Sequence, residues 1–291
     1  MTATIMDGKA LAARIRAEVA ADVAELGHVG LATILVGDDP ASDVYIRAKH
    51  TASLEGGIDA HDLRLPSSIT QEKLLAQVAE LNADDAVDGI LVQLPLPDGL
   101  DEAAAIRAVD PVKDVDGFHP LNAGQLYLGD PAHVGGTPLG VLELLDEYGV
   151  ELGGANAVVI GRSDIVGKPV ALLLQHRNAT VTVCHSRTRD LEAEVRRADI
   201  VVAAVGIPGL VRADWIKEGA AVIDVGIVRT DAGLRGDVEP AAGDRAAFLT
   251  PVPGGVGPMT VAMLLRNAVK AARYRRGELA FPGTRGYVSR A

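Results

Sequence analysis

The first half of the chain alternates between apolar runs and amphipathic stretches. Between residues 7 and 26 the apolar side chains fall three or four positions apart, the spacing of one face of a helix. These side chains are Leu11, Ile15, Val19, Val23 and Leu26. Buried strands are then expected at 31–36, 60–65 and 87–92, with helices at 40–55 and 70–82. Such alternation predicts a mainly parallel sheet with helices on its faces.

A second alternating series begins with a helix expected at 137–148. Its strands are expected at 157–160, 180–184, 200–204, 221–225 and 247–250. This rhythm is typical of a doubly wound nucleotide-binding domain. A last helix is expected at 258–273, because Pro258 suits the first helical position. The segment 98–136 is rich in Pro, Gly, Asp and His, which predicts loops and short elements.

The fold class predicted from these patterns is α/β with two domains. An N-terminal α/β domain is expected to comprise residues 1–137 and 258–291, so that the C-terminal helix returns to it. A Rossmann-like doubly wound domain is expected at 138–257. The length of 291 residues agrees with this division, since a domain holds roughly 100–200 residues.

Composition narrows the function classes. The chain has 28 Lys and Arg against 39 Asp and Glu, a formal net charge of −11. That charge argues against nucleic acid or an anionic membrane as the main partner, because both would be repelled. One cysteine allows no internal disulfide and no multi-cysteine zinc site, so no metal site and a cytoplasmic location are expected. No apolar run reaches the roughly 20 residues that span a bilayer, and no secretion signal is recognised.

A nucleotide site is indicated where the strand at 157–160 runs into a turn, Gly161-Arg-Ser-Asp-Ile-Val-Gly-Lys-Pro169, and then a helix. Such a turn exposes backbone N–H groups to a pyrophosphate. Ser163 stands where the common G-x-G-x-x-G pattern has its second glycine, so the turn taken alone could also simply pack helix on strand. Arg162 could add a charge at the cofactor or be a solvated side chain.

The end of the next strand indicates which nucleotide is preferred. NAD-binding domains place an acid there to bind the ribose 2′-hydroxyl, whereas this chain has His185, Ser186, Arg187 and Thr188. A hydroxyl and a cation suit a 2′-phosphate, so NADP is the expected cofactor. Cys184, inside the apolar strand, is interpreted as a core residue rather than a nucleophile.

A chemical site is indicated in the first half. Tyr45 and Lys49 are four residues apart on an expected helix and so share a face. A partly desolvated lysine could exchange protons with a substrate, although a surface lysine and a packing tyrosine would give the same pattern. Gln93 follows a strand that prolines end, where it could hydrogen-bond a ligand or Lys49.

Two loops extend this site. The stretch 111–120 contains Asp114 and Asp116, either of which could accept N–H donors from a heterocycle or serve the turn beside Gly117. The stretch 250–260 is a Gly- and Pro-rich loop that opens the last helix. It could lie against a flat ligand or only turn a corner.

With these residues assembled, the chain resembles the bifunctional methylenetetrahydrofolate dehydrogenase/methenyltetrahydrofolate cyclohydrolase family. The motifs that carry the resemblance occur in the family's order over about residues 5–274. They are Tyr45-x-x-x-Lys49, Asp88-Gly-Ile-Leu-Val-Gln-Leu-Pro-Leu-Pro97, Lys113-Asp-Val-Asp-Gly117, Gly161-Arg-Ser-x-x-Val-Gly-x-Pro169 and Pro251-Val-Pro-Gly-Gly-Val-Gly-Pro-Met-Thr260.

The resemblance implies a multifunctional enzyme, an oxidoreductase and hydrolase, that uses NADP and tetrahydrofolate derivatives in one-carbon metabolism and purine biosynthesis. It implies that Lys49 is the key catalytic residue, that Tyr45 positions the substrate, that Gln93 tunes Lys49 and that Asp116 holds the pterin. The implied cofactor contacts are Gly161, Arg162, Ser163, Ser186 and Ile227, and the residues after the second strand of this half add Arg187. The further implied substrate contacts are Val92, Leu94, Pro253, Gly254, Gly255, Val256 and Gly257. A homodimer is also implied.

Three other classes of protein share some of these features. Short-chain dehydrogenases share Tyr-x-x-x-Lys, but there the pair follows the nucleotide turn. Shikimate- or amino-acid-type dehydrogenases share the domain order and leave the two long motifs unexplained. A folate- or NADP-binding protein without catalysis would not need both Lys49 and Gln93. Residues 270–291 hold six basic residues and one acid, and a solvated terminus is the preferred interpretation over a binding arm.

Overall fold

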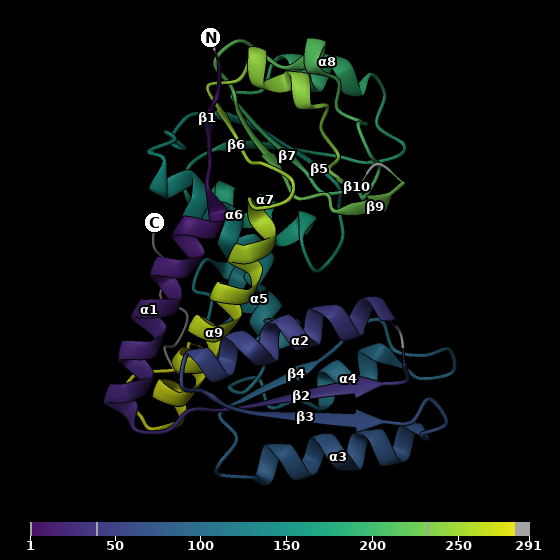
Figure 1. The fold of residues 1–291 in the computed structure, drawn as a ribbon, viewed down its shortest axis with the longest axis vertical. Helices are drawn as coiled ribbons and strands as arrows, with labels where there is room; N and C mark the ends of the chain where they lie inside the picture. The colour runs from purple at the N-terminus through teal and green to yellow at the C-terminus, as the bar shows by residue number, and fades with distance from the viewer. Residues whose placement is uncertain (1, 39, 232, 283–291) are drawn as a thin grey trace. The chain divides into compact units, whose positions relative to one another are not determined.

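The computed structural model describes residues 2–38, 40–231 and 233–282, with the backbone alone for residues 40–45 (Figure 1). The chain divides into two units. The six-stranded unit comprises Met1–Ala13 and Gly135–Met263, and the three-stranded unit comprises Arg14–Val134 and Leu264–Ala291. Helices α1 (Gly8–Leu26) and α9 (Val256–Arg275) each contribute residues to both units.

The three-stranded unit is built on β2 (Gly30–Val36), whose residues are all buried. β3 (Asp59–Leu65) and β4 (Gly89–Val92) pair with β2 in parallel, one on each side. Because the chain crosses from β3 over β2 to β4, the two crossover helices lie on opposite faces of the sheet (Figure 1). These helices are α2 (Pro40–Glu55) and α3 (Gln71–Ala83).

Periodicity explains how α3 covers its face of the sheet. Its buried residues Leu74, Val78 and Leu81 are four and three positions apart, and Thr70 accepts a hydrogen bond from the amide of Lys73 at the N-cap. They share a core with alternate residues of β2 and with the short helix α4 (Glu102–Ala108). α5 (Pro120–Leu128) follows in the loop-rich segment.

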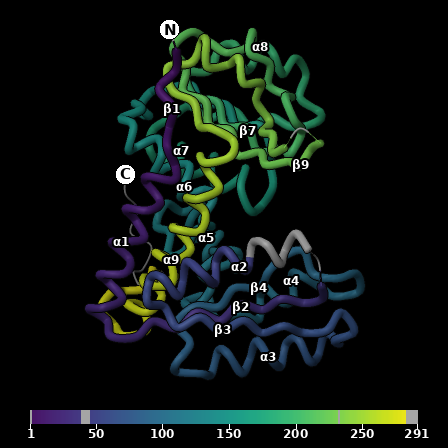
Figure 2. Tube along the Cα trace, viewed as in Figure 1, coloured from purple at the N-terminus to yellow at the C-terminus, as the bar shows by residue number. Residues whose placement is uncertain are grey.

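Within the same unit, α1 and the second part of α9 run side by side (Figure 2). Two ion pairs join them, Arg273 to Asp22 at 2.8 Å and Arg266 to Glu18 at 3.3 Å. The amide of Asn267, also on α9, donates to the carbonyls of Val115 and Val134 at 2.7 and 2.8 Å. The C-terminal helix therefore returns to the three-stranded unit, as the sequence predicts.

The six-stranded unit holds a parallel sheet in the order β1-β11-β8-β7-β5-β6. The direction of winding reverses between β5 and β7, and ligands of doubly wound sheets bind at the carboxyl ends of such a pair. α8 lies on one side of the sheet, and α6 and α7 lie on the other (Figure 1). The strands are β1 (Thr4–Ile5), β5 (Asn156–Ile160), β6 (Thr180–Cys184), β7 (Ile200–Ala203), β8 (Ala221–Asp224) and β11 (Phe248–Leu249). The remaining elements are α6 (Gly136–Glu147), α7 (Gly167–His176), α8 (Leu191–Arg196), the 3-10 helices η1 (Ala213–Trp215) and η2 (Pro240–Asp244), and the hairpin β9 (Val228–Thr230) and β10 (Gly233–Arg235).

Two features of this unit differ from the sequence analysis. α9 begins at Val256, so the prediction that Pro258 takes its first position was wrong. Proline is tolerated there because the amides of the first helical turn have no partner within the helix. β1 and the β9–β10 hairpin were not predicted, since strands of two or three residues show no measurable period. No helix of the described residues is long and apolar enough to cross a membrane.

Candidate active site

Lys49 projects from α2 and meets the residue that follows β4. Its Nζ donates to Oε1 of Gln93 at 3.1 Å. The amide of Gln93 continues the β4 ladder by donating to Ile34 at 2.9 Å, and its side-chain Nε2 donates to the carbonyl of Leu94 at 2.8 Å. Backbone pairing and the Nε2 bond thus orient the Gln93 amide, and its oxygen is left to accept from Lys49. Of the two partners predicted for Gln93, the structure shows Lys49.

Asp116 lies close enough to Lys49 for their charges to interact. Burial raises the pKa of Asp116 to about 6; the Lys49 ammonium opposes this shift and the neighbouring Asp114 adds to it. A carboxyl group with such a pKa is ionised for most of the time at neutral pH but changes state just below it. The structure therefore brings together Lys49, Gln93 and Asp116, three of the four residues expected to carry the chemistry.

The fourth, Tyr45, belongs to the backbone course of α2, and its side chain lies outside the described part of the structure. Its position one helical turn before Lys49 is consistent with a shared face. Its contact with a substrate stays a prediction.

Asp114 has a different task from Asp116. Its carboxylate accepts hydrogen bonds from the amide of His119 and from Nδ2 of Asn122, both at 2.8 Å. Burial raises its pKa, and these bonds oppose the increase. Asp114 therefore holds the turn, one of the two roles left open for the pair.

Lys113 anchors the same loop to α3. Its Nζ donates to the carbonyls of Leu81, Asn82 and Asp84 at 2.8–2.9 Å, where α3 ends. A cation is stabilising at the carbonyl end of a helix. Its own carbonyl accepts from Ile90 of β4 at 2.7 Å. Burial lowers the pKa of Lys113, with Arg275 as a second cause. The side chain and the backbone carbonyl of Lys113 therefore both position the loop that carries Asp116.

In the six-stranded unit, the predicted nucleotide turn joins β5 to α7. Gly161 has φ of 122°, and a Cβ there would lie 2.3 Å from the carbonyl oxygen of Ala204. A Cβ on Gly167 would meet the carbonyl oxygen of Gly161 at 2.3 Å. Ser163 accepts from the amides of Val166 and Gly167 at 3.2 and 3.3 Å. The glycines therefore permit close packing, and Ser163 shapes the turn as it opens α7.

The residues after β6 form an exposed turn. The amide of His185 donates to Oγ1 of Thr188 at 2.8 Å, and the amide of Arg187 donates to Nδ1 of His185 at 3.1 Å. Ser186 and Arg187 are exposed, as is Arg162 after β5. Cys184 is fully buried and burial raises its thiol pKa, as expected of a core residue.

The Gly- and Pro-rich loop packs against the start of α1. The amide of Lys9 donates to the carbonyl of Gly254 at 3.1 Å, and a Cβ on Gly8 would lie 1.8 Å from the carbonyl oxygen of Gly255. A Cβ on Gly257 would meet Cδ1 of Ile227 at 3.2 Å, so the loop lies beside this partly exposed side chain. The loop therefore turns the chain from β11 into α9 and packs against α1. Contact with a ligand stays a prediction for Pro253, Gly254, Gly255, Val256 and Gly257.

Two buried aspartates were missed by the sequence analysis. Asp237 accepts from the amides of Val205, Gly206 and Ile207 at 2.6–3.1 Å, and so fixes the loop after β7. Asp224 at the end of β8 accepts from Gly226, Asp237 and Val238 at 2.8–3.0 Å. Burial, together with the charge of Asp237, raises the pKa of Asp224 to about 6, against those hydrogen bonds. The sequence did offer a signal for Asp224, because it is a carboxylate at the end of the apolar strand Ala221–Asp224.

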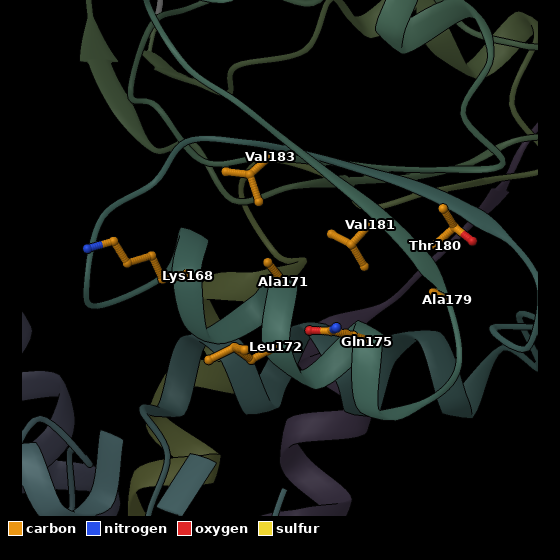
Figure 3. A pocket seen from close by; sticks show the side chains of 8 residues that line it. All are labelled: Lys168, Ala171, Leu172, Gln175, Ala179, Thr180, Val181 and Val183. Atoms are coloured by element: carbon orange, nitrogen blue, oxygen red, sulfur yellow. The ribbon is translucent and has the colours of Figure 1, made fainter. Parts of the chain in front are cut away.

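A hollow of about 580 Å³ lies elsewhere in this unit, between α7 and β6. Figure 3 shows Val181 and Val183 of β6 facing Ala171 and Leu172 of α7 across it. None of the predicted site residues lines it. Among the described residues, no group of three or more His, Cys, Asp or Glu side chains is placed to hold a metal ion.

The raised pKa of Asp116 generates a stability prediction for Asp116→Asn. Because the folded pKa of about 6 exceeds the ordinary aspartate value of 3.8, the folded chain binds the proton more tightly, and ionisation costs stability as the pH rises from about 4 to 7. The amide variant escapes this cost. It should be about 1–3 kcal/mol more stable than the native chain at pH 7 and nearly equal to it at pH 4.

Urea unfolding at pH 4, 5, 6 and 7 measures this difference. Asp98→Asn, an exposed aspartate after β4, controls for the general loss of one negative charge. A difference between Asp116→Asn and the native chain that stays constant over this pH range would contradict the burial of an ionisable carboxyl.

Two family models together match nearly the whole chain. Residues 6–116 match the catalytic domain of tetrahydrofolate dehydrogenase/cyclohydrolase, and residues 135–276 match its NAD(P)-binding domain. The bifunctional protein FolD of Acidiphilium cryptum is 58% identical over 279 residues, 95% of this chain and 100% of that protein.

Solved structures agree with these matches. The FolD methylenetetrahydrofolate dehydrogenase/cyclohydrolase of Campylobacter jejuni has a TM-score of 0.92 and 47% identity, covering 94% of this chain and 99% of its own. The Trypanosoma brucei enzyme, complexed with NADP cofactor and inhibitor, has a TM-score of 0.91 and 45% identity, covering 96% and 100%. The predicted family, fold class and enzyme class are confirmed: the chain belongs to the tetrahydrofolate dehydrogenase/cyclohydrolase family.

Proposed function

We propose that this chain oxidises 5,10-methylenetetrahydrofolate to the 5,10-methenyl form with NADP and hydrolyses the product to 10-formyltetrahydrofolate. The observation that carries the proposal is the grouping of Lys49, Gln93 and Asp116 in the three-stranded unit, within the match to the family's catalytic domain. Both steps interconvert one-carbon folates, which supply purine biosynthesis.

Lys49 manages protons in the hydrolysis. Water attacks the methenyl carbon, a C–O bond forms, and the bond from this carbon to N5 of the folate breaks. The water gives up two protons; one reaches N5 and the other is released. The Lys49 amine relays these protons from a position held by Gln93 at 3.1 Å. Hydride transfer requires orientation more than acid–base assistance, so the lysine acts chiefly in the second step.

Asp116 holds the heterocycle of the folate. Its carboxylate is partly buried and interacts with the Lys49 charge. In the ionised form it accepts hydrogen bonds from ring N–H groups, and charge-assisted bonds of this kind are the stronger ones. Tyr45, Val92, Leu94 and the Pro253–Gly257 loop complete the proposed substrate contacts.

NADP is the proposed cofactor, and when bound it supplies the hydride acceptor. The residues fit such a group: glycines close the turn between β5 and α7, and Ser186 and Arg187 offer an exposed hydroxyl and cation after β6. Gly161, Arg162, Ser163 and Ile227 are the further proposed contacts. On this proposal residues 138–257 form the NADP-binding domain, and residues 1–137 with 258–291 form the catalytic, folate-binding domain.

We further propose a homodimer that acts in the cytoplasm. The family resemblance supports the homodimer, and the single cysteine supports the cytoplasm, because no disulfide of the chain calls for an oxidising compartment. The surface of the six-stranded unit adds support for a second copy, because β6 is an edge strand and pairs with β5 alone among the described strands. Val183 of β6 is 40% exposed beside the hollow of Figure 3. An apolar edge strand left open favours pairing with another chain.

The role of Lys49 is tested by Lys49→Ala. Loss of an acid–base group should lower the cyclohydrolase kcat by about 100-fold or more. The dissociation constant of NADP, measured by calorimetry, should change less than about twofold, since Lys49 lies outside the segment that matches the NAD(P)-binding domain. Lys73→Ala on the exposed face of α3 is the matched control. Equal losses of NADP affinity and turnover in Lys49→Ala would contradict the assignment.

The cofactor preference is tested by Arg187→Ala. A charge-assisted bond to a 2′-phosphate is worth about 1.5–3 kcal/mol, so NADP affinity should fall about 10- to 100-fold. NAD lacks that phosphate, and its affinity should hardly change. Arg189→Ala, two residues further along the same exposed segment, should leave both affinities in place. A native chain that binds both cofactors equally well, or an Arg187→Ala variant that loses both equally, would refute the preference.

A further inference from the structure

The chain continues in an ordered course after the family match ends at residue 276. α9 ends at Arg275, and Gly277 reverses the chain with φ of 73°, a conformation that suits glycine. The amides of Gly277 and Glu278 donate to the carbonyls of Tyr274 and Arg273 at 3.1 and 3.0 Å. The turn therefore sends the chain back along the three-stranded unit.

The returning segment, Leu279–Pro282, makes specific contacts. The ring of Phe281 meets Tyr274 edge-on, with centroids 5.2 Å apart, and lies 6.4 Å from the ring of His133. The carbonyl of Pro282 accepts from Nε2 of Gln125 at 2.5 Å. Gln125, on α5, is only 6% exposed. The segment thus touches two residues that belong to the loop-rich region 98–136.

His133 connects this segment to the site loop, Pro111–Gly117. It is fully buried, and its Nε2 donates to the carbonyl of Val112 at 2.9 Å. Burial lowers its pKa to about 4, so the ring is neutral at neutral pH. A Cβ on Gly117 would lie 2.7 Å from the carbonyl oxygen of His133, so the backbone of the site loop also packs on this residue.

Helix α5 connects the segment to the same loop by a second route. Asn122, one turn before Gln125, donates to the carbonyl of Pro111 at 2.9 Å and to the carboxylate of Asp114 at 2.8 Å. Both side chains are buried on one face of α5. Through His133 and α5, Phe281 and Pro282 therefore support both ends of the site loop, Pro111–Gly117, which carries Asp116.

We propose that Leu279–Pro282 is a positioning segment that fixes the site loop Pro111–Gly117, and with it the Asp116 carboxylate, for folate binding. The inference rests on the proposed function for its effect on folate, and on the contacts alone for its effect on the loop. Misplacing a substrate-binding group by a fraction of the substrate's size weakens binding and turnover even when the altered residue lies far from the chemistry.

Two truncations provide the test. One chain ends at Pro282 and keeps the segment; the other ends at Glu278 and lacks it. The readouts are amide hydrogen exchange of residues 110–119, the KM for the folate substrate, and the dissociation constant of NADP. The full-length variants Phe281→Ala and Phe281→Leu accompany them, so that a truncation that fails to fold leaves the question open to measurement.

The chain ending at Pro282 should match the full chain in every readout. The chain ending at Glu278 and Phe281→Ala should exchange amides of residues 110–119 about tenfold faster and raise the folate KM about tenfold, with NADP affinity unchanged. Phe281→Leu, which keeps an apolar side chain, should restore most of the difference.

Unchanged exchange in residues 110–119 without the segment would overturn the proposal. So would an equal increase in exchange across the whole three-stranded unit, which would show a general loss of stability rather than a loss of position. If the full chain fails to turn over the folate substrate, the proposed function is wrong, and the exchange comparison still decides whether the segment fixes the loop.

Discussion

The charges of Lys49 and Asp116 interact in a partly buried region of the three-stranded unit, and the surrounding residues keep both side chains in place. Removing charges from water is costly unless partners are supplied. Gln93 gives Lys49 an oxygen at 3.1 Å, and backbone pairing to Ile34 fixes Gln93 at the end of β4. The Lys49 charge in turn offsets part of the burial that raises the pKa of Asp116 to about 6. Chemistry at Lys49 therefore depends on where a parallel strand ends.

In each unit, a buried charged side chain holds a loop by binding its backbone. Lys113 donates to three carbonyls at the end of α3, and Asp237 accepts from three consecutive amides after β7. Each side chain satisfies several backbone groups that no sheet or helix would satisfy. Loops held in this way keep a fixed shape without secondary structure of their own, which a binding site at strand ends requires.

The sequence predicted the long elements because their apolar residues repeat with a measurable period. Helix α1 and strand β6 were predicted within a residue of their bounds. Motif spacing likewise singled out Lys49, Gln93 and Asp116, which the structure brings together. It could not separate the roles of Asp114 and Asp116, because that depends on Asn122 and His119 folding back over Asp114. Asp237 escaped notice because its partners lie about 30 residues away, joined only by the tertiary fold.

The most direct test of the account is a two-wavelength absorbance assay of the native chain with 5,10-methylenetetrahydrofolate and NADP. One signal follows NADPH and the other follows the methenyl form. The account predicts that NADPH accumulates while the methenyl signal stays low, since hydrolysis consumes that product. Absence of both signals in a folded chain would contradict it. Accumulation of NADPH and the methenyl form in equal amounts would contradict the hydrolytic role given to Lys49.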